Sequence, residues 1–108
     1  MVDVIISKGN LNGKGVYAGR NFSRGDIVIR YHLKALTNEE LKHLSEREKE
    51  YVHVHWGISY LYAEPERYVN HSTTPNTYQD LKNYCDVALK NIAKGEMITT
   101  DAAKDDVS

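Results

Sequence analysis

The sequence predicts a small, mostly β domain with one inserted helix. Short runs rich in β-branched and aromatic residues recur along the chain, and frequent glycine and asparagine residues separate them. That pattern is typical of short strands joined by turns. A single segment instead carries the charged and apolar spacing of a helix. The chain has 108 residues, the size of one domain, and we expect that domain to span residues 1–108.

The first third of the chain predicts three strands. Residues 4–6 form the first extended run, and the glycine and asparagine residues at 10–15 favour a turn because they tolerate a positive φ. Residues 16–18 then resume the extended chain. After a second turn at residues 21–26, the β-branched run at 27–33 predicts the third strand.

One helix is predicted between residues 38 and 50. Thr37 is a suitable N-cap, and Glu40 three residues later completes the pattern of a capping box. Leu41 and Leu44 supply an apolar stripe, with charged residues around it. The helix is therefore expected to interrupt the series of strands midway.

The second half of the chain returns to β patterns. Residues 51–56 alternate in the manner of a strand, and residues 58–62 form another extended candidate. Residues 84–90 and 97–100 predict the last two strands. We expect Trp56 to pack in the core.

Composition excludes several classes of protein. Lys and Arg number 14 against 15 Asp and Glu, so nothing predicts a direct electrostatic contact with nucleic acid or with an anionic membrane. Cys85 is the only cysteine, which excludes an intramolecular disulfide and a cysteine-based zinc site. We expect it to be a small buried apolar residue.

The sequence shows neither a membrane-spanning segment nor a signal peptide. No apolar run approaches the roughly 20 residues of a membrane helix, and no signal peptide is visible. We therefore expect an intracellular protein, cytoplasmic, or nuclear if its source is eukaryotic.

His53 and His55 share one face of a predicted strand, but no cysteine or acidic residue has matching ligand spacing, so no metal is expected.

The most informative segment is the polar cluster at residues 67–76, which reads RYVNHSTTPN. Asparagine, histidine and serine side chains are costly to bury unless they find hydrogen-bond partners. The same residue types before Pro-Asn are also ordinary turn formers. Taken alone, the segment predicts either a well-bonded structural knot or a ligand site.

Three segments, in this order, resemble the SET domain of lysine methyltransferases. They are GKGVYA at residues 13–18, RYVNHSTTPN at 67–76 and KGEMITTD at 94–101. In that family the corresponding motifs read roughly G-x-G-V-x-A, R-F-(I/V)-N-H-S-C-x-P-N and G-E-E-(I/L)-T-x-D-Y. The resemblance spans residues 8–101, and its most specific part is the Asn-His-Ser segment.

The resemblance implies a fold and an activity. The fold is the SET-domain (β-clip) fold, in which small sheets surround a knot-like C-terminal segment. The activity is that of a protein-lysine N-methyltransferase of minimal SET type, which transfers a methyl group from S-adenosylmethionine to a lysine of a protein substrate. Such a reaction needs a neutral amine held in line with the methyl group, and an apolar channel favours the neutral form.

The resemblance also places the cofactor. It is expected against Gly13, Lys14 and Gly15, because glycine lets the backbone approach a ligand closely. It is expected next to Asn70 and His71 as well. The amide of Asn70 would bind the methionine end, and the backbone of His71 would bind the adenine end.

One arginine and several tyrosines complete the implied site. Arg67 begins the middle motif, and it either contacts the cofactor carboxylate or the knot, or remains a solvated surface charge. Tyr51, after the predicted helix, is expected to be the catalytic tyrosine that lines the lysine channel. Tyr60 and Tyr62 are alternatives for this role, whereas Tyr68 is expected in the core.

The final motif departs from the family pattern. Ala102 stands where the family has an active-site tyrosine, and Thr73 replaces the cysteine of the middle motif. Loss of an active-site hydroxyl is typically worth about 10²- to 10⁴-fold in rate. An alternative therefore stays open, namely a catalytically impaired SET-fold module that binds cofactor or peptide.

A homodimer is also expected. The family's usual C-terminal cover over the channel has no counterpart in the sequence after Ala102, which would leave apolar channel wall facing water. Two-fold pairing is the commonest way for a small protein to cover such a patch. The contact is expected in the segment 41–56 or in the short tail.

Overall fold

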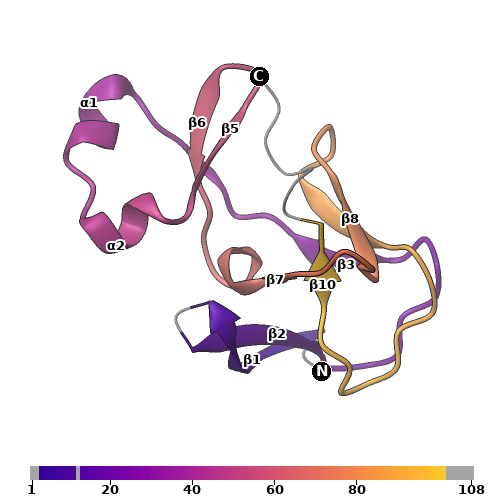
Figure 1. The fold of residues 1–108 in the computed structure, drawn as a ribbon. Helices are drawn as coiled ribbons and strands as arrows, with labels where there is room; N and C mark the ends of the chain where they lie inside the picture. The colour runs from indigo at the N-terminus through magenta and orange to yellow at the C-terminus, as the bar shows by residue number, and fades with distance from the viewer. Residues whose placement is uncertain (1–2, 12, 102–108) are drawn as a thin grey trace.

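The fold is built from short strands, as expected. The computed structural model describes residues 3–11 and 13–101. In chain order the elements of this part of the protein (Figure 1) are β1 (Val4–Leu11), β2 (Lys14–Ala18), β3 (Ile27–Arg30), β4 (Lys34–Ala35), α1 (Asn38–Lys42), α2 (Glu46–Lys49), β5 (Val52–His55), β6 (Ile58–Leu61), the 3-10 helix η1 (Glu66–Tyr68), β7 (Asn70–His71), β8 (Thr77–Asp80), β9 (Cys85–Ala88) and β10 (Thr99–Thr100).

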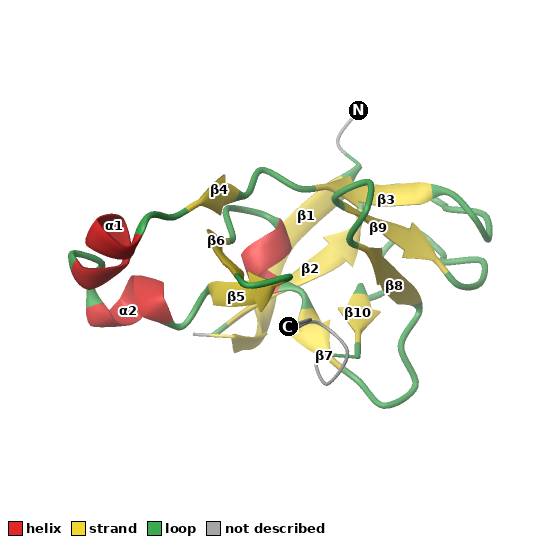
Figure 2. Cartoon of the chain, turned by 90° about the horizontal axis from the view of Figure 1, so that it is seen from above, coloured by secondary structure: helices red, strands yellow, loops and turns green. Residues whose placement is uncertain are grey.

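These strands form small separate sheets rather than one large sheet. The hairpin β1–β2 and the three-stranded sheets β3–β9–β8 and β4–β6–β5 are antiparallel. The pair β10–β7 is parallel. In Figure 2 the two helices lie at one end of the molecule, away from the β3–β9–β8 sheet. The predicted mostly β architecture of small sheets with a helical insert is confirmed.

The C-terminal segment ties together strands that lie far apart in the sequence. Met97 forms a bridge with Tyr17 of β2, and the backbone N–H of Ile98 donates to the carbonyl of Val16 at 2.7 Å. From the next residue, Thr99, β10 runs parallel to β7 (Figure 1). Residues 97–100 therefore lie beside both the β1–β2 hairpin and the Asn-His strand, which is the arrangement expected for the knot-like segment.

The core gathers side chains from almost every sheet. Its buried apolar members are Val16, Ala18, Phe22, Val28, Ile29, Tyr51, Tyr62, Tyr68, Val69, Ala88, Ile92 and Ile98. Tyr68 and Cys85 are buried, as predicted. Burial also raises the pKa of the Cys85 thiol, which disfavours the reactive thiolate.

The expectation that Trp56 packs in the core is wrong. Trp56 and Gly57 form the two-residue turn between β5 and β6, with φ angles of 51° and 77°. A tight hairpin turn of this kind takes a positive φ at both central positions. Trp56 therefore sits at the tip of the hairpin, and half of its surface is exposed.

The single helix predicted over residues 38–50 is replaced by two short ones. The capping box of Thr37 and Glu40 is confirmed at the start of α1. A second cap then competes with continuation of the helix, because the Ser45 hydroxyl accepts a hydrogen bond from the N–H of Glu48 at 3.2 Å. Neither helix contributes a buried residue, so no core contact favours one continuous helix.

Other boundaries also differ from the prediction. The first strand continues to Leu11, because β1 pairs with β2 almost to the turn. The lead-in to the Asn-His segment is the 3-10 helix η1 rather than an extended run, since the N–H of Tyr68 donates to the carbonyl of Pro65 at 3.0 Å and the N–H of Val69 to that of Glu66 at 3.3 Å. Strands β4 and β8 are not predicted by the sequence. Among the described residues, no helix is long and apolar enough to cross a membrane.

Candidate active site

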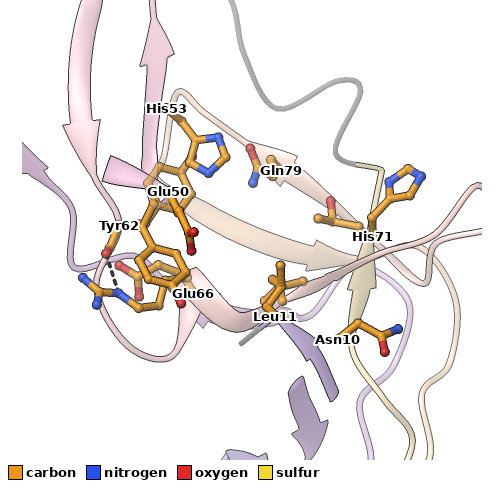
Figure 3. Close-up of a pocket in the computed structure, with 12 residues that line it drawn as sticks. Asn10, Leu11, Glu50, His53, Tyr62, Glu66, His71 and Gln79 are labelled. Carbon is orange, nitrogen blue, oxygen red and sulfur yellow. Dashed lines mark hydrogen bonds between the residues drawn. The ribbon is translucent and has the colours of Figure 1, made fainter. Parts of the chain in front are cut away.

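The largest concentration of predicted site residues surrounds a cavity of about 330 Å³. It lies where the end of β1, the residues before and within β5, η1, β7 and β8 come together (Figure 3). Its lining residues are Asn10, Leu11, Glu50, Tyr51, His53, Tyr62, Glu66, Arg67, Val69, His71, Gln79 and Thr100. We call it the first cavity.

A second cavity of about 300 Å³ shares part of this wall. It is lined by Pro75, Thr77, Tyr78, Gln79, Leu89, Thr100 and Asp101. Gln79 of β8 and Thr100 of β10 line both cavities. The two hollows are therefore adjacent, and these two residues belong to the wall of both.

Asn70 is the structural link between the β1–β2 hairpin and the 3-10 helix. Its side chain is buried, and its carbonyl oxygen Oδ1 accepts from the backbone N–H of Asn10 at 2.8 Å. Its Nδ2 donates to the carbonyl of Lys14 at 3.1 Å and to that of Tyr68 at 2.9 Å. Both amide protons of Asn70 are thus used inside the protein. The side chain holds the expected cofactor-binding backbone in place.

The glycine turn reaches this link at close range. Gly13, at the turn itself, has a φ of 77°, which favours glycine. A Cβ atom built on Gly15 would lie 3.3 Å from Nδ2 of Asn70 and 3.3 Å from Cε of Met97. A Cβ on Gly9 would lie 2.4 Å from the carbonyl oxygen of Lys14. Gly9 therefore allows the two strands of the hairpin to lie this close to each other, and Gly15 allows the hairpin to lie against Asn70 without displacing its amide.

The side chain of Arg67 is not a free surface charge. The residue belongs to η1 and precedes the parallel pair of β7 and β10. Its Nε donates to the carbonyl of Tyr62 at 2.8 Å (dashed line in Figure 3). The centre of its guanidinium lies 4.6 Å from the centroid of the Tyr51 ring, a cation–π contact. The Tyr51 ring meets that of Tyr68 edge-on, with the centroids 5.7 Å apart. The arginine is thereby fixed as part of the cavity wall.

His71 lies on the opposite side of the first cavity from His53 (Figure 3). It belongs to β7, and about half of its side chain is exposed. Its Nδ1 lies 3.8 Å from a carboxylate oxygen of Asp101, beyond the end of β10. The ring is thus close to the point where the described chain ends.

The structure brings together some of the predicted site residues. Tyr51, Arg67 and His71 line the first cavity, and Asn70 lies directly behind it. By contrast Gly13, Lys14 and Gly15 are not among the lining residues. They reach the site through the Asn70 hydrogen bond to the Lys14 carbonyl. The binding roles of all these residues stay predictions.

Tyr60 and Tyr62, the alternatives to Tyr51 as the catalytic tyrosine, differ in their position relative to the cavities. Tyr62 lines the first cavity, and its hydroxyl bonds Nε2 of His55 at 2.7 Å. Tyr60 lines neither cavity and pairs with Tyr84, whose hydrogen bond raises the pKa of the Tyr60 hydroxyl. Ala102, the position of the missing family tyrosine, lies outside the described residues.

Glu66, His53 and Gln79 are among the residues of the cavity wall that sequence reasoning did not place at the site. Glu66 is buried, and its carboxylate accepts from the backbone N–H groups of His32 and Ala63. His53 stacks parallel to His55 across the face of β5, with 6.4 Å between ring centroids. Gln79 is the third, and no local pattern singles it out. The predicted strand alternation does place His53 and Tyr51 on one face, but it does not indicate that this face lines a cavity.

His53 and His55 are not part of a larger cluster of metal ligands among the described residues. No group of three or more metal-ligating side chains occurs in residues 3–11 and 13–101. His55 is fully buried and bonded to Tyr62, so its partner is a hydroxyl within the core.

Comparison with known proteins agrees with this architecture. A family model for the SET domain matches residues 13–101. Histone-lysine N-methyltransferase 2D of Homo sapiens is 27% identical over 92% of this chain, and that of Mus musculus matches to the same extent. The chain spans 2% of the length of these curated relatives.

Solved structures share the fold. A Plasmodium falciparum crystal structure superposes with a TM-score of 0.73 at 22% identity, over 94% of each chain. A chain of the Chaetomium thermophilum Polycomb Repressive Complex 2 superposes with a TM-score of 0.74 at 21% identity, over 97% of this chain and 15% of that one. Identities this low establish the fold alone. Because the family model covers most of the sequence and the parallel β7–β10 pair joins its two C-terminal motifs, the chain belongs to the SET domain family.

Proposed function

We propose that this chain is an S-adenosylmethionine-dependent protein-lysine N-methyltransferase of minimal SET type. The observation that carries the proposal is the pair of cavities with a shared wall at Gln79 and Thr100. Methyl transfer needs two reactants held on either side of one reaction point. The first cavity, with the predicted cofactor residues around it, would hold the cofactor, and the second would admit a lysine side chain.

The residues present fit the cofactor. The Arg67 guanidinium is held at the first cavity and offers a charge-assisted partner for a carboxylate. Leu11, Val69 and the Tyr51 ring supply apolar surface in the same wall. At Gly15 the β1–β2 hairpin lies close to Asn70. Its backbone N–H and carbonyl groups are thereby kept near the site, where they would bind the cofactor. When bound, S-adenosylmethionine would supply a methyl group on a positively charged sulfur.

The protein's own contribution would be desolvation and alignment. A lysine ammonium ordinarily has a pKa near 10.4 and cannot attack while protonated. Entry into a partly apolar cavity lowers that pKa, because burial disfavours the charged form. The Tyr51 ring, fixed between Arg67 and Tyr68, would form one rigid side of the first cavity and keep the cofactor in position there. The names of the curated relatives support lysine as the residue that is methylated.

The proposal is tested first by methyl transfer to a mixed protein extract with labelled S-adenosylmethionine. We expect label on lysine and one-site binding of the cofactor by titration calorimetry. Arg67→Gln should weaken that binding about 10-fold or more, because a charge-assisted hydrogen bond is lost. Arg24→Gln is the matched control, since Arg24 is exposed and lies in neither cavity. Absence of cofactor binding at millimolar concentration would sink the proposal.

A second candidate function rests on Ala102. A SET-family chain without the terminal tyrosine of its motif would bind cofactor or peptide and transfer methyl groups slowly or not at all. The two candidates differ in one readout. Calorimetric binding of the cofactor with no label on any protein, in a folded sample, would favour the binding module.

We also propose that two copies of the chain associate. Val54, Trp56 and Ile58, at the end of the β5–β6 hairpin, are exposed by 39%, 50% and 45%. Exposed apolar side chains at the end of one hairpin favour a contact that both copies can share. Light scattering at micromolar concentration should give twice 12.3 kDa.

A charge at the hairpin tip tests the contact. Trp56→Glu should reduce the mass to that of one chain, because a buried unpaired carboxylate opposes association. Ile5→Glu, on β1 and exposed by 45%, is the matched control and should leave the mass unchanged. A wild-type mass of 12.3 kDa would refute the dimer.

A further inference from the structure

Gln79 carries an acceptor that the rest of the described protein does not use. Its side-chain oxygen Oε1 is buried, and no hydrogen-bond partner for it exists among the residues that the structure describes. A buried carbonyl without a donor is uncommon in native proteins and calls for a physical explanation. Because the residue lines two cavities, rotation about the terminal bond of its side chain would present this unused acceptor to a donor that enters from either one.

The position of Gln79 narrows the identity of that donor. The residue lies on β8, where it pairs with Asp86 of β9, so the strand fixes its direction. Its side chain lines both cavities, and in the view of Figure 3 it lies between the side chains of His53 and His71. A donor that reaches the oxygen thus stands at the wall between the two hollows. If the proposed function holds, this is where the substrate amine meets the methyl group.

We propose that Oε1 of Gln79 accepts one N–H of the substrate amine and thereby selects amines that still carry a hydrogen. This inference rests on the proposed function and adds a residue that limits the degree of methylation. A neutral primary amine has two N–H groups, a monomethyl amine has one, and a dimethyl amine has none. With one N–H bonded to the carbonyl, the nitrogen lone pair points away from it at the tetrahedral angle.

The transfer step balances with this arrangement. The nitrogen lone pair forms the new C–N bond while the bond between the methyl carbon and sulfur breaks. Sulfur keeps that electron pair and becomes a neutral thioether, and the product ammonium releases its proton to water. The first and second transfers can use the Gln79 bond, whereas a third cannot. Mono- and dimethyllysine are the expected products.

A binding measurement tests the acceptor without any turnover. Gln79 is the only glutamine of the sequence, so a protein labelled with ¹³C at the glutamine side-chain carbonyl gives one signal. Titration with n-butylamine, the lysine side chain as a small molecule, should shift this signal. Butylamine is protonated in neutral solution, so butyltrimethylammonium has the same charge but no N–H, and it should not shift the signal. Equal shifts with both compounds, or no shift with either, would overturn the inference.

A kinetic measurement tests selection. It uses three peptides around the lysine that the transfer assay identifies, with that residue unmethylated, monomethylated or dimethylated. Gln79→Leu should slow transfer to the first two about 10-fold, the value of one hydrogen bond in the transition state, and leave the dimethyl peptide unchanged. Gln79→Glu keeps an acceptor of the same size and should retain the wild-type preference. Lys82→Leu, in the exposed turn after β8, is the control and should behave as wild type.

The outcomes separate the inference from the proposed function. A butylamine shift without methyl transfer to any protein would refute the methyltransferase and keep the amine site. Methyl transfer with the same peptide preference in wild type and Gln79→Leu would refute the role of Gln79 and keep the methyltransferase. If Gln79→Leu does not fold, the butylamine titration of the wild-type protein still decides.

Discussion

Asn70→Ala should lower the free energy of unfolding by about 3 kcal/mol or more, because it leaves three buried or half-buried backbone groups without their partner. Those groups are the N–H of Asn10 and the carbonyls of Lys14 and Tyr68. The loss is large because the three bonds join segments up to 60 residues apart. Urea unfolding followed by far-ultraviolet circular dichroism measures it. Cofactor affinity should fall with it, since the hairpin loses its anchor.

Two variants sharpen this prediction. Asn70→Asp keeps the acceptor for Asn10 but loses both donors, so its loss of stability should be comparable or larger because a buried carboxylate then faces two carbonyls. Asn83→Ala removes an exposed asparagine that bonds only its local neighbour Asp80 and should cost under about 1 kcal/mol. A loss for Asn70→Ala no greater than that of Asn83→Ala would contradict the structural role of Asn70.

Ala102→Tyr should raise the initial rate of methyl transfer about 10²-fold at saturating cofactor. The expectation comes from the family motif, which ends in a tyrosine at this position. A hydroxyl in the active site can orient the amine or handle its proton. Ala103→Tyr is the matched control, because it adds the same side chain one position later. An equal increase in both variants, or none in either with the fold retained, would show that Ala102 does not limit the rate.

Several residues of the site can be predicted from the sequence because they belong to contiguous motifs. The RYVNHSTTPN segment supplies Arg67, Asn70 and His71, and all three lie at the first cavity or directly behind it. Tyr51 is found by its place after the predicted helix, and it lines the same cavity. The capping box at Thr37 is equally local, since it involves backbone and side chains within four residues.

The hydrogen-bond partner of each residue, by contrast, cannot be predicted from the sequence. An asparagine in a polar segment can face a ligand or its own backbone, and only the approach of the hairpin decides between them. The same holds for Gln79, whose oxygen becomes notable only when two cavities meet at its strand. The break between α1 and α2 depends on Ser45 and on the lack of a core contact that would favour a longer helix.

By itself, the sequence determined the family, the alternation of short strands with turns, the cap of the first helix and the three lining residues Tyr51, Arg67 and His71 of the first cavity. These follow from side-chain types at fixed spacing, which act over a few residues. The tertiary structure alone decided that Asn70 serves the backbone, that Trp56 is exposed and that Gln79 stands between two cavities. Such outcomes depend on hydrogen bonds and strand pairings between distant segments, and local pattern carries no information about which distant groups will meet.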